Sequence, residues 1–136
     1  MSQVIPPNQY AVGQLWACQG RHDGERPTLL INRIDQHPLG GGNIYHVTLD
    51  ALQIRNPRLA EGLMTQLAHA PVTAQTLERS QLQLIGQRAP DPVYLQGYDQ
   101  WREAFDAGNA GSFGVSIATI LEIVERQLNG IPLDQP

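Results

Sequence analysis

The stretch that most constrains the fold is Asn43–Asp50, whose sequence is Asn-Ile-Tyr-His-Val-Thr-Leu-Asp. It follows Gly40-Gly41-Gly42, a run that is costly to hold in regular structure. The stretch is rich in β-branched and aromatic residues, and successive side chains of a strand point to opposite faces. It is therefore predicted to be the central strand of a sheet.

A second apolar run, Thr28–Asp35, precedes this strand and has the composition of a strand itself. Pro38–Asn43 lies between the two runs and is predicted to be a hairpin loop. We expect His37 to pair with Ile44, which fixes the alignment of the two strands. The two runs then form an antiparallel pair with one side on a core.

This register decides which side chains meet across the hairpin. One face becomes mainly apolar and the other mainly polar. The apolar face pairs Ile34 with Val47 and Asn32 with Leu49, and the polar face pairs Asp35 with His46 and Arg33 with Thr48. A slip by one residue would place Ile34 beside His46 and spoil this division.

Three further segments complete the sheet and its connections. Tyr10–Gly20 is predicted to be a first strand, so that three strands form a meander. Leu52 and Ile54 predict a brief continuation before the turn at Asn56-Pro57. Leu59–Leu67 fits either a short helix or a loop.

The second half of the chain has the signals of helices. Thr73 is expected to cap a helix that runs to about Ile85 and stops at Gly86. Another helix is predicted over about Leu95–Ala107. Ser116 precedes the clearest helical pattern, with apolar residues at Ile117, Ile120, Leu121, Val124 and Leu128 and a stop at Asn129-Gly130.

Strands first and helices later predict an α+β fold rather than alternating α/β. We expect an N-terminal antiparallel meander of three to four strands, packed against two or three C-terminal helices. The single domain should cover residues 10–130, with a loose N-terminal tail at 1–9 and a C-terminal tail at 131–136. The helix Ser116–Leu128 should cover the apolar face that carries Ile34, Tyr45, Val47 and Leu49.

Composition limits the classes of function. The 136 residues carry a formal net charge of −4, and all nine basic residues are Arg. An acidic balance without a basic run argues against general nucleic-acid binding. The single cysteine, Cys18, excludes an internal disulfide and a cysteine-based zinc site. No signal peptide or membrane-length apolar run is evident, so we expect a cytoplasmic protein without membrane attachment.

The sharpest chemical constellation is Asp35, His37 and His46 on the polar face of the predicted hairpin. Two imidazoles and a carboxylate are suited to Zn²⁺ or Fe²⁺, or to an acid/base pair. His69 would add a fourth group if its segment folds back. The alternative is a set of ordinary polar residues on a solvent-facing hairpin surface, because no established motif supports the cluster.

Two other features allow a structural and a functional interpretation. Gly108–Gly114 precedes a helix and resembles an anion-binding loop, but its spacing matches no phosphate-binding motif, so a tight turn with Phe113 in the core is favoured. Tyr98, Trp101 and Phe105 share one helical stripe. Such a stripe is usually core, but if it is exposed, Tyr98 and Trp101 would form a partner-binding surface.

Five pieces spread over most of the chain together resemble a small uncharacterised bacterial single-domain family. They are Val-Gly-Gln-Leu-Trp at 12–16, Ile-Tyr-His-Val-Thr-Leu-Asp-Ala-Leu at 44–52, Ile-Arg-Asn-Pro at 54–57, His-Ala-Pro-Val-Thr at 69–73 and Gln-Trp-Arg-Glu-Ala-Phe-Asp-Ala-Gly at 100–108. The resemblance implies a bacterial, cytoplasmic, stand-alone domain. It attaches no activity, ligand or catalytic residue to the chain.

The sequence alone does not establish a function, and it leaves open whether the chain is an enzyme. A non-catalytic binding protein, an immunity-type antagonist or an adaptor, is favoured because a small acidic domain carries no strong catalytic motif and no cofactor is expected. Its acidic surface would meet a basic protein partner. The alternative is a metal-binding protein or small metal-dependent enzyme that uses Asp35, His37 and His46.

Overall fold

The computed structural model describes residues 10–37 and 42–130. The predicted tails at 1–9 and 131–136 lie outside the described residues, as does most of the loop between the two hairpin strands. The fold is α+β, as predicted, with an antiparallel sheet in the N-terminal part and helices in the C-terminal part. No helix within the described ranges has the length and apolar character needed to cross a membrane.

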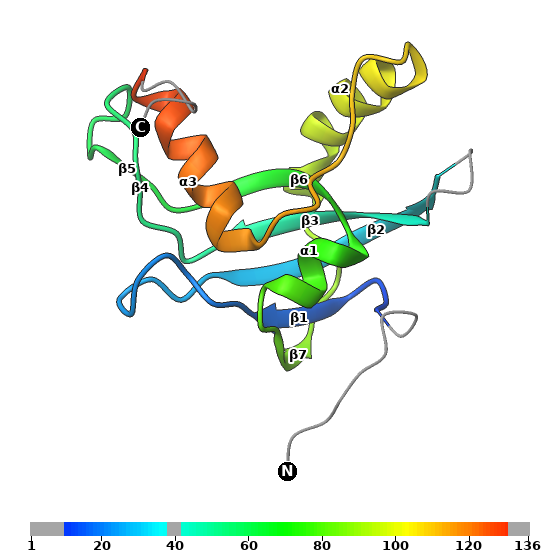
Figure 1. Ribbon diagram of the computed structural model, residues 1–136, viewed down its shortest axis with the longest axis horizontal. Helices are drawn as coiled ribbons and strands as arrows, with labels where there is room; N and C mark the ends of the chain where they lie inside the picture. Colours follow the sequence, from blue (N-terminus) through cyan, green and yellow to red (C-terminus); the bar gives the residue numbers. More distant parts are fainter. Residues whose placement is uncertain (1–9, 38–41, 131–136) are drawn as a thin grey trace.

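The main sheet has five strands in the order β6-β3-β2-β1-β7, which run from top to bottom in Figure 1. All four pairings are antiparallel. The strands are β1 (Gln14–Ala17), β2 (Thr28–Gln36), β3 (Asn43–Asp50), β6 (Leu67–Thr73) and β7 (Gln83–Gln87). The short strands β4 (Ile54–Arg55) and β5 (Leu63–Met64) form a separate two-stranded ribbon.

Three α-helices and a 3₁₀ turn are present in the described part of the chain. They are α1 (Ala74–Arg79), the turn η2 (Pro92–Tyr94), α2 (Leu95–Asp106) and α3 (Ile117–Leu128). The helices α2 and α3, yellow and orange in Figure 1, stand apart from each other. They contribute to two different core clusters.

The predicted meander of β1, β2 and β3 is present, but its expected register is wrong. Gln36 pairs with Asn43, Asp35 with Ile44 and Arg33 with His46. The backbone N–H of His37 bonds to the carbonyl of Gly42, 2.8 Å away, instead of pairing with Ile44. The pairing is therefore two residues away from the expected one, which keeps Asp35 and His46 on the same face as diagonal neighbours.

A bulge at Asn32 shifts the register once more, so that Ile31 pairs with Val47. Asn32 is buried, and its amide nitrogen donates to the Thr48 hydroxyl at 2.8 Å while its oxygen accepts from the Asp91 backbone N–H at 2.8 Å. A buried amide needs such partners. The bulge brings Asn32 to the polar face of the sheet, not to a position opposite Leu49 as expected.

Strand β3 is buried on both faces, whereas the sequence pattern predicted one wet face. Tyr45, Val47 and Leu49 belong to the main core with α3, as expected. On the other face, His46 and Thr48 are 0% and 1% exposed. Helix α2 and the turn η2 lie over this second face, which turns the polar side chains of the hairpin into interior groups.

The helix predicted from Thr73 to about Ile85 is shorter, and its second half is wrong. Helix α1 ends at Arg79, and residues 83–87 form the edge strand β7 paired with β1. Gln81 separates the two with a φ of 51°, a left-handed conformation that ends the helix. The predicted first strand, Tyr10–Gly20, is also shorter and covers only Gln14–Ala17.

The last helix follows its prediction closely. The Ser116 hydroxyl accepts from the backbone N–H of Thr119 at 3.2 Å, as expected of an N-cap. Ile117, Ile120 and Leu121 are completely buried in the main core. The loop before this helix is a tight connection in which Phe113 packs on the core and pairs with the outer edge of β6 at Val72.

Two short strands and a turn connect β3 to β6. Ile54 and Arg55 form the brief strand that was expected before the turn at Asn56. Residues 59–62 form a turn, and β5 and the start of β6 follow, so Leu59–Leu67 is neither a helix nor a plain loop.

Candidate functional site

Beneath α2, three side chains form a continuous hydrogen-bonded chain. Asp35 Oδ2 on β2 lies 3.0 Å from Nε2 of His46 on β3. Nδ1 of His46 lies 2.9 Å from Nε2 of His69 on β6. Because β2, β3 and β6 are consecutive neighbours in the sheet, these side chains share one face and line up across it. We call this chain the Asp–His–His relay.

The relay has one consistent arrangement of protons. Burial opposes ionisation of Asp35, but hydrogen bonds from Arg33 and Tyr98 outweigh burial and lower the pKa of the carboxyl group. The carboxylate therefore accepts hydrogen bonds and donates none. His46 must therefore donate from Nε2 and, while neutral, accept at Nδ1. His69 must then donate from Nε2, which leaves a lone pair on its Nδ1.

Both imidazoles are held neutral. Burial lowers the pKa of His46 to about 4, although the Asp35 carboxylate works in the opposite direction. Burial, together with the neighbouring His46, lowers the pKa of His69 to about 4 as well. The neutral relay therefore persists through the whole range around pH 7.

Helix α2 covers the relay with aromatic side chains. The Tyr98 hydroxyl donates to Asp35 Oδ2 at 3.0 Å, and the rings of Tyr98 and Trp101 lie 4.8 and 4.7 Å from that of His46. Tyr98 and Trp101 are only 7% and 8% exposed. They belong to a second core cluster with Ile44 and Tyr94, so the exposure required for a partner-binding stripe is not met.

The structure brings together part of the predicted metal constellation. Asp35, His46 and His69 meet, but His46 lies between the other two and both its ring nitrogens are engaged. His37 packs edge-on against Phe105, with ring centroids 5.5 Å apart. In the described ranges, no three His, Cys, Asp or Glu side chains are grouped to hold a metal ion.

The outer face of α2 has the opposite character to its buried face. Asp99, Glu103 and Asp106 recur at i, i+4 and i+7 and are all exposed. At the start of the helix, Val93 and Leu95 are 39% and 45% exposed. The helix therefore presents three carboxylates to solvent, of which that of Asp106 is paired with Arg102 at 3.3 Å. These carboxylates, together with Leu95 and with Val93 in η2, are called the acidic face.

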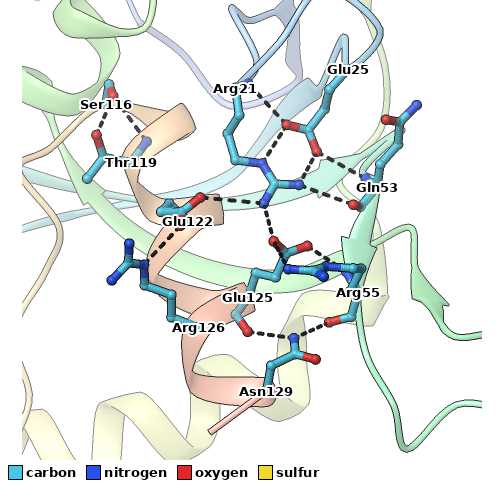
Figure 2. A network of polar contacts seen from close by, with 10 residues as sticks. All are labelled: Arg21, Glu25, Gln53, Arg55, Ser116, Thr119, Glu122, Glu125, Arg126 and Asn129. Carbon is cyan, nitrogen blue, oxygen red and sulfur yellow. Dashed lines mark hydrogen bonds and ion pairs between the residues drawn. The ribbon is translucent and has the colours of Figure 1, made fainter. Parts of the chain in front are cut away.

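A second polar network joins the loop after β1 to α3 (Figure 2). The Arg21 guanidinium holds Glu25 with two bonds of 2.9 and 2.8 Å, and it reaches Glu125 on α3 at 3.1 Å. Backbone N–H groups of Arg21 and Gln53 donate to the same Glu25 carboxylate. Glu125 in turn accepts from the backbone N–H of Arg55 at 2.7 Å.

Glu25 is the anchor of this network. Its side chain is completely buried, and burial alone would raise its pKa. The Arg21 side chain and the backbone N–H groups of Arg21 and Gln53 outweigh burial and lower the pKa to about 2. A paired buried carboxylate of this kind fixes the position of its loop.

Two shallow cavities flank Arg21. One, of about 300 Å³, is bordered by the loop at residues 18–26. The other, of about 320 Å³, is lined by Arg21, His22, Gln53, Arg55, Glu122 and Glu125. The charged groups that line the second cavity already bond to one another, so we assign this network to holding the loop on α3.

Sequence reasoning missed two of the contacts that matter. Tyr98 fits the apolar stripe of α2 in the sequence, and no sequence pattern indicates its hydrogen bond to Asp35. The pairing of Arg21 with Glu25 had a weak signal, since the two residues are four apart in a polar turn. Only the compact loop between β1 and β2 brings them together.

Comparison of the chain with protein-family models, with curated proteins and with solved structures found no match.

Proposed function

We propose that this protein is an interaction protein, an antagonist or adaptor, whose acidic face on α2 binds a basic surface of a protein partner. The observation that carries the proposal is the exposed row of Asp99, Glu103 and Asp106 beside the exposed Val93 and Leu95. Carboxylates attract a basic partner over distance, and apolar side chains supply contact area once it is bound.

The construction of α2 supports this role. Its inner face is fixed on the sheet by Tyr98 and Trp101, so the acidic face is held on a packed helix. A preformed surface loses little conformational freedom on binding. The formal net charge of −4 adds a weak long-range attraction for basic proteins.

The test is capture of a partner from lysate of the source cells with purified protein, followed by mass spectrometry. We expect one stoichiometric protein to be retained at low salt and to be lost at moderate salt, because exposed charges are screened. The variant Asp99→Asn/Glu103→Gln should lose this partner. Leu95→Ala should retain it with faster dissociation.

The matched control is Asp23→Asn/Glu61→Gln, which removes two exposed carboxylates from loops away from α2. Both double variants change the net charge by the same amount, so the control separates local recognition from general charge. Retention of the partner by the α2 variant, or equal loss in the control, would refute the proposal. A clean blank at low salt would refute it as well.

A further inference from the structure

The Asp–His–His relay has the geometry of a catalytic triad in which an imidazole takes the place of the nucleophile. In such triads, a nucleophile lies within about 2.6–3.2 Å of a base that a third group orients. Here His69 lies 2.9 Å from His46, and His46 lies 3.0 Å from Asp35. Both distances are those of working hydrogen bonds.

The His69 end of the relay lies beside Gly97 of α2 and is partly accessible to solvent. His46 is completely buried with both ring nitrogens engaged, whereas His69 is only partly buried. Nδ1 of His69 has no hydrogen-bond partner among the described residues. Every side-chain nitrogen or oxygen in these residues that lacks a partner is at least partly accessible to solvent, and this includes Nδ1 of His69. Solvent therefore reaches Nδ1 of His69, whose lone pair accepts no hydrogen bond from the described residues.

We infer that His69 Nδ1 is a nucleophile that accepts an acyl group from a neutral ester or anhydride, with His46 as the base and Asp35 as the residue that positions it. This activity is separate from the proposed acidic face, because it uses the opposite side of α2. A negative result for the acidic face therefore leaves the acyl-transfer activity of His69 unaffected, and the reverse also holds.

The step balances without another reactant. Nδ1 of His69 attacks the carbonyl carbon, an N–C bond forms, and the bond from carbon to the leaving oxygen breaks with its electron pair. The Nε2 proton of His69 passes to Nδ1 of His46, whose imidazolium is stabilised by the Asp35 carboxylate. The leaving oxygen takes a proton from water, and the hydroxide so formed hydrolyses the acyl-imidazole. His46 then returns its proton to Nε2 of His69, which restores the relay.

The surroundings favour a neutral acyl donor over a phosphoryl donor. The groups around His69 are the backbone of Gly97 on α2, the His46 ring and the aromatic rings of Tyr98 and Trp101, with ring centroids 6.2 and 6.4 Å away. In the described chain, His69 has no ion pair or hydrogen bond to an arginine. A transferred phosphoryl group would need such positive charge.

The experiment measures carbethoxylation of each histidine by diethyl pyrocarbonate, with peptide mass spectrometry at several times. His22 is exposed and serves as the reference within the same molecule, and His46 is buried and serves as the unreactive one. We expect His69 to react at least tenfold faster than His22 although it is less exposed. Equal or slower reaction of His69 would overturn the inference.

Variants test the role of the relay. Asp35→Asn should reduce the ratio of the His69 rate to the His22 rate at least tenfold, and Asp35→Glu should restore part of it. Glu61→Gln is the matched control, because it removes an exposed carboxylate outside the relay and should leave the ratio unchanged. An unchanged ratio in Asp35→Asn would refute the role of the relay.

A spectroscopic measurement keeps the inference testable if a variant fails to fold. Nitrogen-15 chemical shifts of the wild-type histidines at pH 7 report which ring nitrogen carries the proton. We expect His69 to be protonated at Nε2 and bare at Nδ1, and His46 to have the same tautomer. A proton on Nδ1 of His69 would remove the nucleophile and with it the inference.

Discussion

Gly97 on α2 and His69 on β6 lie so close that a Cβ atom on residue 97 would stand 2.8 Å from the Cβ of His69. The glycine lets the helix approach the relay. We expect Gly97→Ala to destabilise the protein by about 1–2 kcal/mol, because the clash exceeds the helix propensity that alanine brings. Urea unfolding followed by circular dichroism measures this loss.

The control for this substitution is Gly86→Ala on β7, where an added Cβ meets no atom within 4 Å. Its free energy of unfolding should stay within about 0.5 kcal/mol of the wild type. A stabilised Gly97→Ala protein would show that α2 does not rest on His69 in solution.

Removal of the Glu25 charge should strongly lower the free energy of unfolding. Glu25→Gln leaves Arg21 without its bidentate partner in a site where the Glu25 side chain is fully buried. Breaking a buried pair on one side costs about 3 kcal/mol or more. Thermal or urea unfolding measures the change.

Glu122→Gln is the matched control, since its carboxylate is 4.0 Å from Arg21 and its side chain is 48% exposed. Such an exposed contact contributes at most about 1 kcal/mol. If the two variants lose similar stability, the Arg21 network does not anchor the loop.

Stability should fall in two stages on acidification. The pKa of His46 and of His69 is about 4 in the folded protein, against an ordinary value of 6.5. Between pH 6.5 and pH 4, the unfolded chain therefore binds more protons, and stability decreases as the pH falls. The pKa of Glu25, which is lowered from 4.5 to about 2, adds a second loss of stability as the pH falls between these two values.

Urea midpoints measured from pH 8 to pH 3 test this profile. His69→Gln should make the decline between pH 6.5 and pH 4 shallower, whereas His22→Gln on the exposed loop should leave it unchanged. A flat midpoint over that range in the wild type would contradict the buried, neutral state of the two imidazoles.

Ala51, directly after β3, is held in a left-handed conformation with a φ of 58°. A residue with a Cβ pays about 1 kcal/mol for this conformation, which glycine adopts freely. Ala51→Gly should therefore stabilise the protein by about 0.5–1 kcal/mol. The control is Ala118→Gly within α3, which should destabilise it by about 1 kcal/mol. In thermal unfolding, we expect the two substitutions to change the stability in opposite directions. Changes in the same direction would contradict the strain at Ala51.

The sequence predicted those elements whose signals are local. The alternation in Asn43–Asp50 gave the bounds of β3, and Ser116 with its apolar spacing gave those of α3. Strand β7 was missed because Leu84 continues the apolar spacing that begins with Leu77 in α1. Only its pairing with β1, far away in the sequence, makes it a strand.

For the candidate site too, the sequence predicts only what depends on local pattern. The face shared by Asp35 and His46 was predictable, because a two-residue error in register does not change which face a side chain occupies. The bulge at Asn32 was not predictable, since its reason is a pair of distant partners, Thr48 and Asp91. The cover provided by α2, which makes the relay a buried group, likewise depends on tertiary packing.

The strand order has a consequence for how the chain acquires its structure during synthesis. Strand β1, the first in the described part of the chain, is completed on its outer side by β7, and β3 is completed by β6. The helix α3, which covers the main core, is the last of the described elements to be made. A nascent chain that ends before residue 117 therefore leaves the apolar side of its sheet open to water. Cooperative folding must therefore wait until α3 has left the ribosome, and truncations before residue 117 should be prone to aggregate.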